Sequence, residues 1–209
     1  MSGRSAHTAV LVPMKTFSAA KSRLRTHFAD SARQQLAHDM FESVLSAART
    51  CPVVDTTYVL TNGDDVARVA RAQGARVLRD PDEHSGRAAA LGSLIDWGLA
   101  QLTSHGVTRA LVLMADLPRV TPDDVGALCA ALVTHEIVAA ADQHGRSTNA
   151  LGVRLPCPML TAFGDPDSYA RHLASARLYG WRVSEIVNPR LAHDVDRPDD
   201  VAGAAAFGN

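Results

Sequence analysis

Seven short apolar, β-branched runs alternate along the chain with stretches of helical periodicity, and this alternation limits the possible folds more than any other feature. The apolar runs are Thr8–Pro13, Thr57–Thr61, Ala75–Leu78, Ala110–Met114, Ile137–Ala141, Ala150–Val153 and Val183–Val187. The helical stretches are Ser31–Thr50, Asp64–Gln73, Gly86–Thr103, Pro122–Val133 and Asp167–Tyr179. Strands that alternate with helices favour an α/β sandwich, a mostly parallel sheet with helices on both faces. Only a short polar stretch separates the two runs between 136 and 155, so we expect one antiparallel strand there.

Length and composition set the broad class of the protein. The 209 residues carry no Ser/Gly/Pro-rich linker, which predicts a single domain over residues 1–209. A net charge of −1 does not favour nucleic acid or an anionic membrane as a partner. The first apolar run is too short for a signal peptide, and three scattered cysteines fit a reducing compartment. We therefore expect a cytoplasmic domain of enzyme size.

Three aspartates are candidate metal ligands. The apolar run in LVLMADLP, residues 111–118, stops at Asp116, and HDVD at 193–196 contains Asp194 and Asp196. On extended backbone, residues two apart point to the same side, so these last two carboxylates should lie together. Ligands of open α/β sheets bind at the carboxyl ends of the strands, and three carboxylates there would suit Mg²⁺. The alternative is that each aspartate only caps a helix or a turn.

A cationic segment follows the first apolar run. The sequence PMKTFSAAKSRL, residues 13–24, contains Lys15, Lys21 and Arg23. Such a loop, at the end of a strand and leading toward a helix, is suited to bind a polyphosphate. The two ammonium groups would offset phosphate charge, and the guanidinium could bind two oxygens at once. Neither GxxxxGK[ST] nor GxGxxG occurs, so this is not a Walker or dinucleotide loop; a solvated charged surface is the alternative.

Two polar segments in the second half predict a small anionic pocket. DQHGRSTNAL at 142–151 interrupts two apolar runs, and FGDPDSYARH at 163–172 places Ser168 and His172 on one helical face. The side chains that would line the pocket are Arg146, Thr148, Asn149, Ser168, Arg171 and His172. The alternatives are structural: Asn149 could complete a turn, Ser168 could cap a helix, and His172 could be a satisfied core histidine.

These motifs, taken in order, match one family. With PMKTFSAAKSRL, ADLPRV, STNAL, FGDPDSYARH and HDVDRPDDV, the chain resembles the 2-phospholactate, phosphoenolpyruvate and 3-phosphoglycerate guanylyltransferases of coenzyme F-420 biosynthesis. The resemblance extends from about residue 8 to residue 201. It implies a Rossmann-like nucleotidyltransferase fold related to the sugar-nucleotide transferases. It also implies transfer of GMP from GTP to a small phosphorylated three-carbon acid, with Mg²⁺ as cofactor and release of pyrophosphate.

The resemblance also implies roles for individual residues. Asp116, Asp194 and Asp196 correspond to the metal-binding acids, and Asp116, Lys21 and Lys15 to the catalytic groups. The positions implied at the nucleotide are Lys15, Lys21, Arg23, Gly86, Leu91 and Pro118. Those implied at the acceptor are Thr148 and Ser168, and the pocket predicted from the polar segments adds Asn149 and His172 to them. Independently of the resemblance, the polar segment 142–172 could serve to form a homodimer.

One stretch departs from the family pattern. The family usually has a GLNxAL-like sequence before its third helix, whereas this chain has SGRAAAL at 85–91 and lacks the asparagine. Two alternatives to the guanylyltransferase stay open. One is a nucleotidyltransferase for a sugar phosphate or a pterin cofactor, although such proteins usually begin with a glycine-rich loop that is absent here. The other is a non-catalytic nucleotide-binding protein on the same fold.

Overall fold

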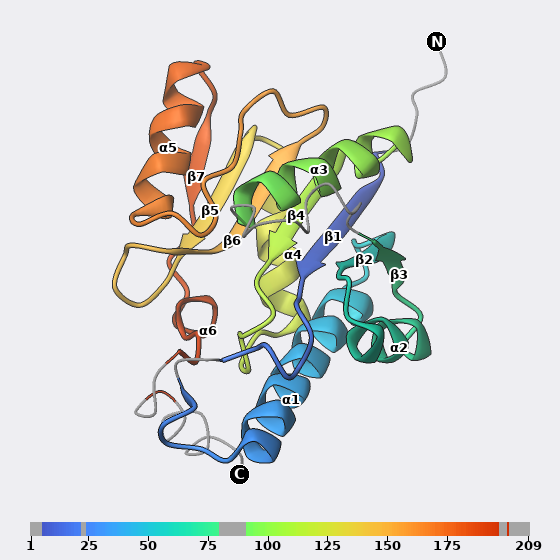
Figure 1. Ribbon diagram of the computed structural model, residues 1–209. Coiled ribbons are helices and arrows are strands. Elements are labelled where there is room, and N and C mark those ends of the chain that lie inside the picture. Colours follow the sequence, from blue (N-terminus) through green and yellow to red (C-terminus); the bar gives the residue numbers. More distant parts are fainter. Residues whose placement is uncertain (1–5, 22–23, 80–90, 197–199, 201–209) are drawn as a thin grey trace.

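A seven-stranded sheet forms the centre of the molecule (Figure 1). The computed structural model describes residues 6–21, 24–79, 91–196 and 200. The strand order is β3-β2-β1-β4-β6-β5-β7. The strands are β1 (Thr8–Pro13), β2 (Thr56–Leu60), β3 (Arg76–Leu78), β4 (Arg109–Leu113), β5 (Ile137–Ala141), β6 (Thr148–Arg154) and β7 (Val183–Glu185). Only β6 runs antiparallel to its neighbours β4 and β5, which confirms the mixed, mostly parallel sheet predicted from the sequence.

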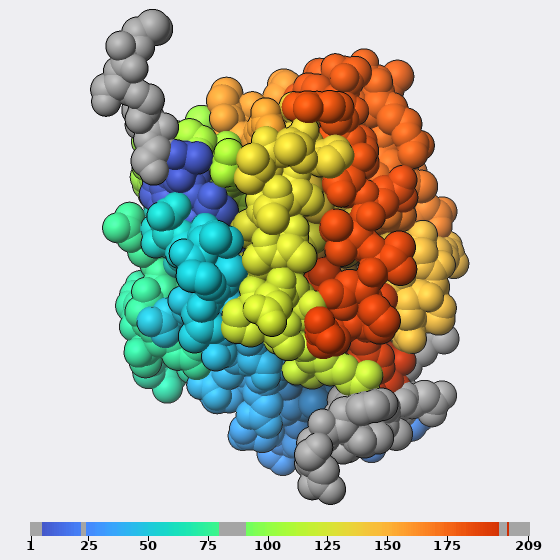
Figure 2. Space-filling model, turned by 180° about the vertical axis from the view of Figure 1, so that it is seen from behind, coloured from blue at the N-terminus to red at the C-terminus, as the bar shows by residue number. Residues whose placement is uncertain are grey.

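Helices cover both faces of the sheet, as the sequence predicts. The helices are α1 (Asp30–Thr50), α2 (Asp64–Ala72), α3 (Leu91–Ser104), α4 (Pro122–Ala131), α5 (Ser168–Leu178) and α6 (Pro189–Ala192). Alternate residues of each strand feed two cores: Val10 and Val12 pack with α1, α2 and α4, whereas Ala9 and Leu11 pack with α3 and α5. Figure 2 shows the first of these faces, where α1, α4 and the segment around α6 lie side by side.

Most element boundaries lie within one or two residues of the predicted ones. The helix predicted over Gly86–Thr103 is observed from Leu91 to Ser104, and residues 86–90 lie outside the described part of the chain. The strand predicted over Val183–Val187 is shorter and ends at Glu185, because the backbone then turns into α6. Helix α6 was not predicted, since four residues are too few to show helical periodicity.

The start of α4 confirms the helix-start pattern in the sequence. Thr121 is the N-cap, Pro122 opens the helix, and Thr121 and Asp124 form a capping box. Asp124 is also almost fully buried. Its carboxylate also binds residues of α6, a contact that belongs to the candidate site described below.

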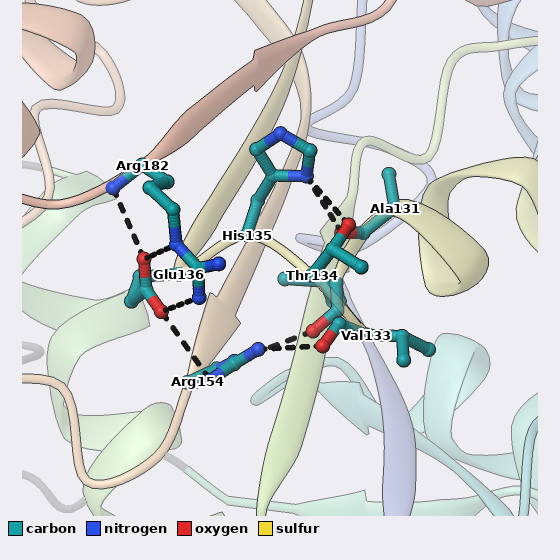
Figure 3. A network of polar contacts seen from close by, with 8 residues as sticks. Ala131, Val133, Thr134, His135, Glu136, Arg154 and Arg182 are labelled. Atoms are coloured by element: carbon teal, nitrogen blue, oxygen red, sulfur yellow. Dashed lines mark hydrogen bonds and ion pairs between the residues drawn. The ribbon is translucent and has the colours of Figure 1, made fainter.

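A polar network joins β5, β6 and β7 at the amino ends of the parallel strands (Figure 3). Glu136, which precedes β5, accepts hydrogen bonds from the Arg182 guanidinium at 2.7 and 3.1 Å and forms an ion pair with Arg154 at 3.3 Å. Arg154 in turn donates to the carbonyls of Leu132 and Val133, which follow α4. Hydrogen bonds from Arg182 hold the pKa of Glu136 down to about 2. The amino end of β5 is thus tied to β6, β7 and α4.

No helix in the described residues combines the length and apolar character that a membrane crossing requires.

Candidate active site

The carboxyl ends of β1 and β4 form a topological switch point in the sheet. The two strands are parallel neighbours, yet the chain leaves β1 toward β2 on one side and returns to β4 on the other. In open α/β sheets a ligand crevice forms at such a point. The loop after β1 carries the cationic segment, and the turn after β4 carries Asp116.

Three carboxylates meet at this switch point. One oxygen each from Asp116, Asp194 and Asp196 lies within 4.8 Å of the other two. The backbone N–H of Val195 donates to the carbonyl of Asp116 at 3.3 Å and ties the HDVD segment to the β4 turn. The side-by-side placement expected for Asp194 and Asp196 is therefore observed.

The donor set of this cluster fits a hard divalent cation. All three ligand atoms are carboxylate oxygens, the type that Mg²⁺ and Mn²⁺ prefer. Among the described residues, Oδ1 of Asp116 is buried without a hydrogen-bond partner, an expensive state for a carboxylate oxygen unless a cation binds it. A second candidate group on the surface of α1, His38, Asp39 and Glu42, differs because none of its polar side-chain atoms is buried without a hydrogen-bond partner.

The environment of Asp194 favours the protonated form of its carboxyl group. Burial raises the pKa of its carboxyl, and the neighbouring Asp116 carboxylate raises it further. The side-chain amide of Asn149 opposes this by donating to Oδ1 of Asp194 at 3.2 Å, and the same nitrogen donates to the carbonyl of Leu191 at 3.0 Å. Asn149 therefore orients one carboxylate of the cluster and holds the end of α6.

Lys21 bridges the cluster. Its Nζ donates to Oδ2 of Asp116 at 2.6 Å and to Oδ1 of Asp196 at 3.0 Å, and the side chain is only 9% exposed. Burial alone would lower the pKa of this ammonium, but the two carboxylates outweigh burial and raise it. Lys21 also has a backbone φ of 52°, a left-handed conformation that non-glycine residues rarely adopt. The cationic segment and the acidic cluster, predicted separately from the sequence, thus meet in space.

Asp124 anchors the segment that carries two of the three aspartates. Its carboxylate accepts hydrogen bonds from the Arg190 guanidinium at 2.6 and 2.7 Å and from the Asn188 amide at 2.6 Å. Burial would raise the pKa of Asp124, yet these donors and Thr121 hold it down to about 2. The anchor fixes α6, and the HDVD segment leaves α6 directly. In the sequence, Asp124 looks like an ordinary residue of a helix start, so no pattern there indicates this role.

The residues that were predicted to bind the acceptor lie close together at the amino end of β6. The Thr148 N–H donates to Oγ of Ser168 at 3.0 Å, and Oγ1 of Thr148 lies 2.9 Å from Nδ1 of His172. The Ala162 N–H donates to Nε2 of His172 at 2.8 Å, so the ring proton belongs on Nδ1, from where it is donated to Thr148. Burial lowers the pKa of His172 to about 4. Thr148, Ser168 and His172 are therefore brought together and all buried, with Ser168 and His172 each hydrogen-bonded to Thr148.

A cavity of about 230 Å³ opens beside the acidic cluster. It is bounded by the β5–β6 turn, the residues before α5 and the HDVD segment, and its lining includes Asp194, Asp196 and Arg146. Asp142, Asp167 and Asp200 also line it, so carboxylates outnumber cationic side chains at this surface. Asp200 was not assigned a role from the sequence. Its carboxylate accepts a hydrogen bond from the Asp196 N–H at 3.0 Å and so supports the HDVD segment.

The remaining predicted nucleotide-binding residues are only partly described. Lys15 is exposed in the loop after β1, Pro118 is half-buried in the turn after Asp116, and Leu91 opens α3. Arg23 and Gly86 lie outside the described residues.

Comparison with known proteins agrees with this geometry. Residues 33–182 match the MobA-like NTP transferase domain. The chain is 34% identical to the phosphoenolpyruvate guanylyltransferase of Sphaerobacter thermophilus, over 96% of this chain and 95% of that protein. It is also 34% identical to the 3-phospho-D-glycerate guanylyltransferase of Phenylobacterium zucineum, over 89% of this chain and 84% of that protein.

The fold has solved counterparts as well. A structure from Desulfovibrio desulfuricans G20, assigned as a nucleotide-diphospho-sugar transferase, superposes with a TM-score of 0.70 at 13% identity and covers 87% of this chain and 80% of its own. The nucleotidyltransferase fold expected from the sequence is therefore confirmed. The chain belongs to the MobA-like NTP transferase family, among the phosphoenolpyruvate and 3-phospho-D-glycerate guanylyltransferases.

Proposed function

We propose that the protein is a Mg²⁺-dependent guanylyltransferase that joins GMP from GTP to a small phosphorylated three-carbon acid. The observation that carries the proposal is the meeting of Lys21 with Asp116 and Asp196 at the switch point, within reach of Asp194. A cationic loop for the triphosphate and an acidic cluster for a metal then share one crevice. The guanylyltransferase relatives, which align over nearly the whole chain, supply the nucleotide and the class of acceptor.

The reaction is a substitution at the α-phosphorus of GTP. A phosphate oxygen of the acceptor forms a new bond to this phosphorus, while the bond to the bridging oxygen of the β-phosphate breaks. The electron pair of that bond leaves with pyrophosphate. A phosphate monoester has a second pKa of about 6, so the attacking oxygen is already ionised near neutral pH. The reaction therefore needs no general base, in keeping with a site whose one buried histidine is neutral and faces Thr148.

Charge repulsion is the main obstacle that the site must overcome. Two like charges about 4 Å apart, at an effective dielectric constant of about 20, repel by about 4 kcal/mol. Mg²⁺ bound by Asp116, Asp194 and Asp196 would screen this repulsion and polarise the α-phosphate. Lys15 and Lys21 bind the triphosphate and stabilise the leaving pyrophosphate. Arg23, Gly86, Leu91 and Pro118 complete the nucleotide side.

We place the acceptor in the 230 Å³ cavity beside the acidic cluster. Because carboxylates dominate its lining, a phosphorylated acid binds there only together with cations. Arg146 supplies one positive charge at the β5–β6 turn. The predicted acceptor residues lie behind this lining: Thr148 is hydrogen-bonded to Ser168 and His172, and Asn149 donates to Asp194 in the cavity wall. We propose that Thr148, Asn149, Ser168 and His172 support the acceptor side of the site from there. The product is suited to enter coenzyme F-420 biosynthesis.

The test is pyrophosphate release by the purified protein with GTP and Mg²⁺. Phosphoenolpyruvate, 2-phospho-L-lactate and 3-phospho-D-glycerate are supplied one at a time, and ATP and CTP serve as nucleotide controls. We expect release with GTP and one of the acids, and its loss in the Asp116→Asn variant. No release with any acid, from folded protein that binds GTP, would refute the proposal. Release with ATP or CTP in preference to GTP would refute the guanine preference.

A further inference from the structure

Arg33 is a buried cation outside the groups assigned above. It lies in the first turns of α1 and its side chain is only 2% exposed, whereas arginine is almost never buried without partners. Its carboxylate partner, Asp30, accepts from Nη2 at 2.9 Å but is itself 76% exposed. An ion pair with an exposed carboxylate is screened by water, so it offsets little of the free energy that the guanidinium loses when it is buried. Arg33 therefore needs another explanation than this ion pair.

The other partners of Arg33 are backbone carbonyls of the cationic segment. Nη1 donates to the carbonyl of Ser18 at 2.9 Å and also to the carbonyl of Ala20. These carbonyls belong to a loop outside the strands and long helices, and the guanidinium supplies each of them with a hydrogen-bond donor. Ala20 directly precedes Lys21.

Lys21 needs such a restraint. Its left-handed φ of 52° costs free energy in a residue with a side chain, and such conformations persist only where the surroundings determine them. At the other end of the loop, Phe17 packs against Phe41, and its N–H donates to Asp65 at 3.0 Å. The loop is thus held at Phe17 by packing and at residues 18–20 by Arg33, immediately before the chain turns Lys21 toward Asp116.

We propose that Arg33 is a positioning residue for guanylyl transfer, one that binds the carbonyls of Ser18 and Ala20 and thereby fixes Lys21 at the acidic cluster. This role rests on the proposed function for its effect on turnover. Its structural part, the placement of Lys21, can be measured without any substrate.

The chain offers an unusually clean probe of that placement. Lys15 and Lys21 are the only two lysines in the whole sequence, and they lie in the same loop. Lys15 is exposed, whereas the Lys21 side chain is 9% exposed and its ammonium is paired. Timed labelling with an amine-acylating reagent, read by mass spectrometry of the peptide from this loop, compares the two directly, with Lys15 as internal control.

We expect Lys21 to react at least tenfold more slowly than Lys15 in the native protein. In Arg33→Gln, labelling of Lys21 should accelerate severalfold while Lys15 stays unchanged. Arg33→Lys keeps a buried cation and should restore much of the protection, with the added lysine read separately from Lys15 and Lys21; if Arg33→Gln does not fold, Arg33→Met, which keeps a long side chain but donates no hydrogen bond, takes its place. Asp30→Asn removes only the exposed partner and should behave as the native protein does.

Gly152→Ala serves as a stability control in β6. An added Cβ there meets Leu132 at 2.8 Å, away from the loop. If labelling of Lys21 were unchanged in Arg33→Gln, the proposal would be overturned. It would also be overturned if both lysines accelerated together, and to the same extent in Gly152→Ala, because the effect would then be global loosening.

A double-mutant cycle tests the consequence for turnover. Arg33→Gln should lower kcat/KM for GTP by about 10- to 100-fold, the size expected for a displaced catalytic contact. In a Lys21→Ala background the same change should have little further effect, because the group it positions is gone. Equal losses in both backgrounds would show that Arg33 acts elsewhere. Absence of any turnover in the native protein would refute the proposed function, while the labelling result would still decide the placement of Lys21.

Discussion

The stability of the protein should depend on pH through His172. The imidazole is fully buried, accepts the Ala162 N–H at Nε2, donates from Nδ1 to Thr148, and packs against the Phe163 ring at 4.9 Å between centroids. Protonation would place a positive charge in this enclosed position and would break the hydrogen bond from Ala162, because Nε2 could no longer accept. The neutral ring is therefore a condition of the native packing.

The size of the effect follows from the two pKa values. Burial lowers the pKa of His172 from 6.5 to about 4 in the folded protein. The unfolded chain therefore binds a proton that the folded protein does not, and acid favours unfolding between these values. The stabilisation is complete above about pH 6.5 and is lost as the pH falls toward 4. It amounts to about 3 kcal/mol in total, of which about 2 kcal/mol is lost between pH 7.5 and pH 5.0.

Urea unfolding followed by circular dichroism at pH 7.5 and pH 5.0 measures this loss. The window lies above the pKa values of about 2 for Asp124 and Glu136, so those carboxylates stay ionised throughout. The His172→Gln variant cannot be protonated, and its amide can accept from one neighbour and donate to another. We expect the variant to lose about 2 kcal/mol less than the native protein over this window. An equal pH dependence in both proteins would refute the argument.

Three further predictions concern other parts of the fold. Asp124→Ala removes the buried carboxylate that binds Arg190 and should lower the free energy of unfolding by about 3 kcal/mol in urea titration; a loss well below 1 kcal/mol would contradict the anchor. Gly92→Ala would place a Cβ 2.6 Å from the Thr161 carbonyl and should cost about 1–3 kcal/mol, visible as a fall in Tm of several degrees, whereas an unchanged Tm would count against this contact. Lys21→Met removes the ammonium that competes for the acidic cluster, so Mn²⁺ titrated into nucleotide-free protein should bind about tenfold more tightly, and equal or weaker binding would show that the lysine does not compete.

Local patterns in the sequence were sufficient to predict the strands and the mostly parallel character of the sheet, but not the order of the strands. Buried parallel strands read as continuous apolar runs, and the runs at Thr8–Pro13 and Ile137–Ala141 match β1 and β5 residue for residue. The short connection between β5 and β6 predicted one antiparallel strand, and the structure shows that this strand is β6. Helix α6 was not predicted because a single turn shows no periodicity. Its position depends on the contact between Arg190 and Asp124, which are 66 residues apart in the sequence.

For the candidate site, the sequence predicted at which end of the sheet the residues lie, but not which of them touch. Topology brings Lys21 and Asp116 to the same edge, but their direct contact spans 95 residues of sequence and depends on a left-handed backbone at Lys21. Arg33 illustrates the same limit. In the sequence it is one more charged residue in an amphipathic helix, and no periodicity shows that its guanidinium reaches back to carbonyls 13 and 15 residues earlier.

The reversed direction of β6 has a consequence for how such a site can diversify. Because β6 runs against β4 and β5, the start of this strand, rather than a loop, lies beside the acidic cluster and contacts it through Asn149. Ladder hydrogen bonds hold this strand wall in register, so an insertion of one residue there would shift every later residue of the strand to the opposite face. The β5–β6 turn at 142–147 carries no such penalty and also lines the cavity. Relatives that accept different acids are therefore expected to differ in the length and composition of this turn, while the strand wall varies only by single substitutions.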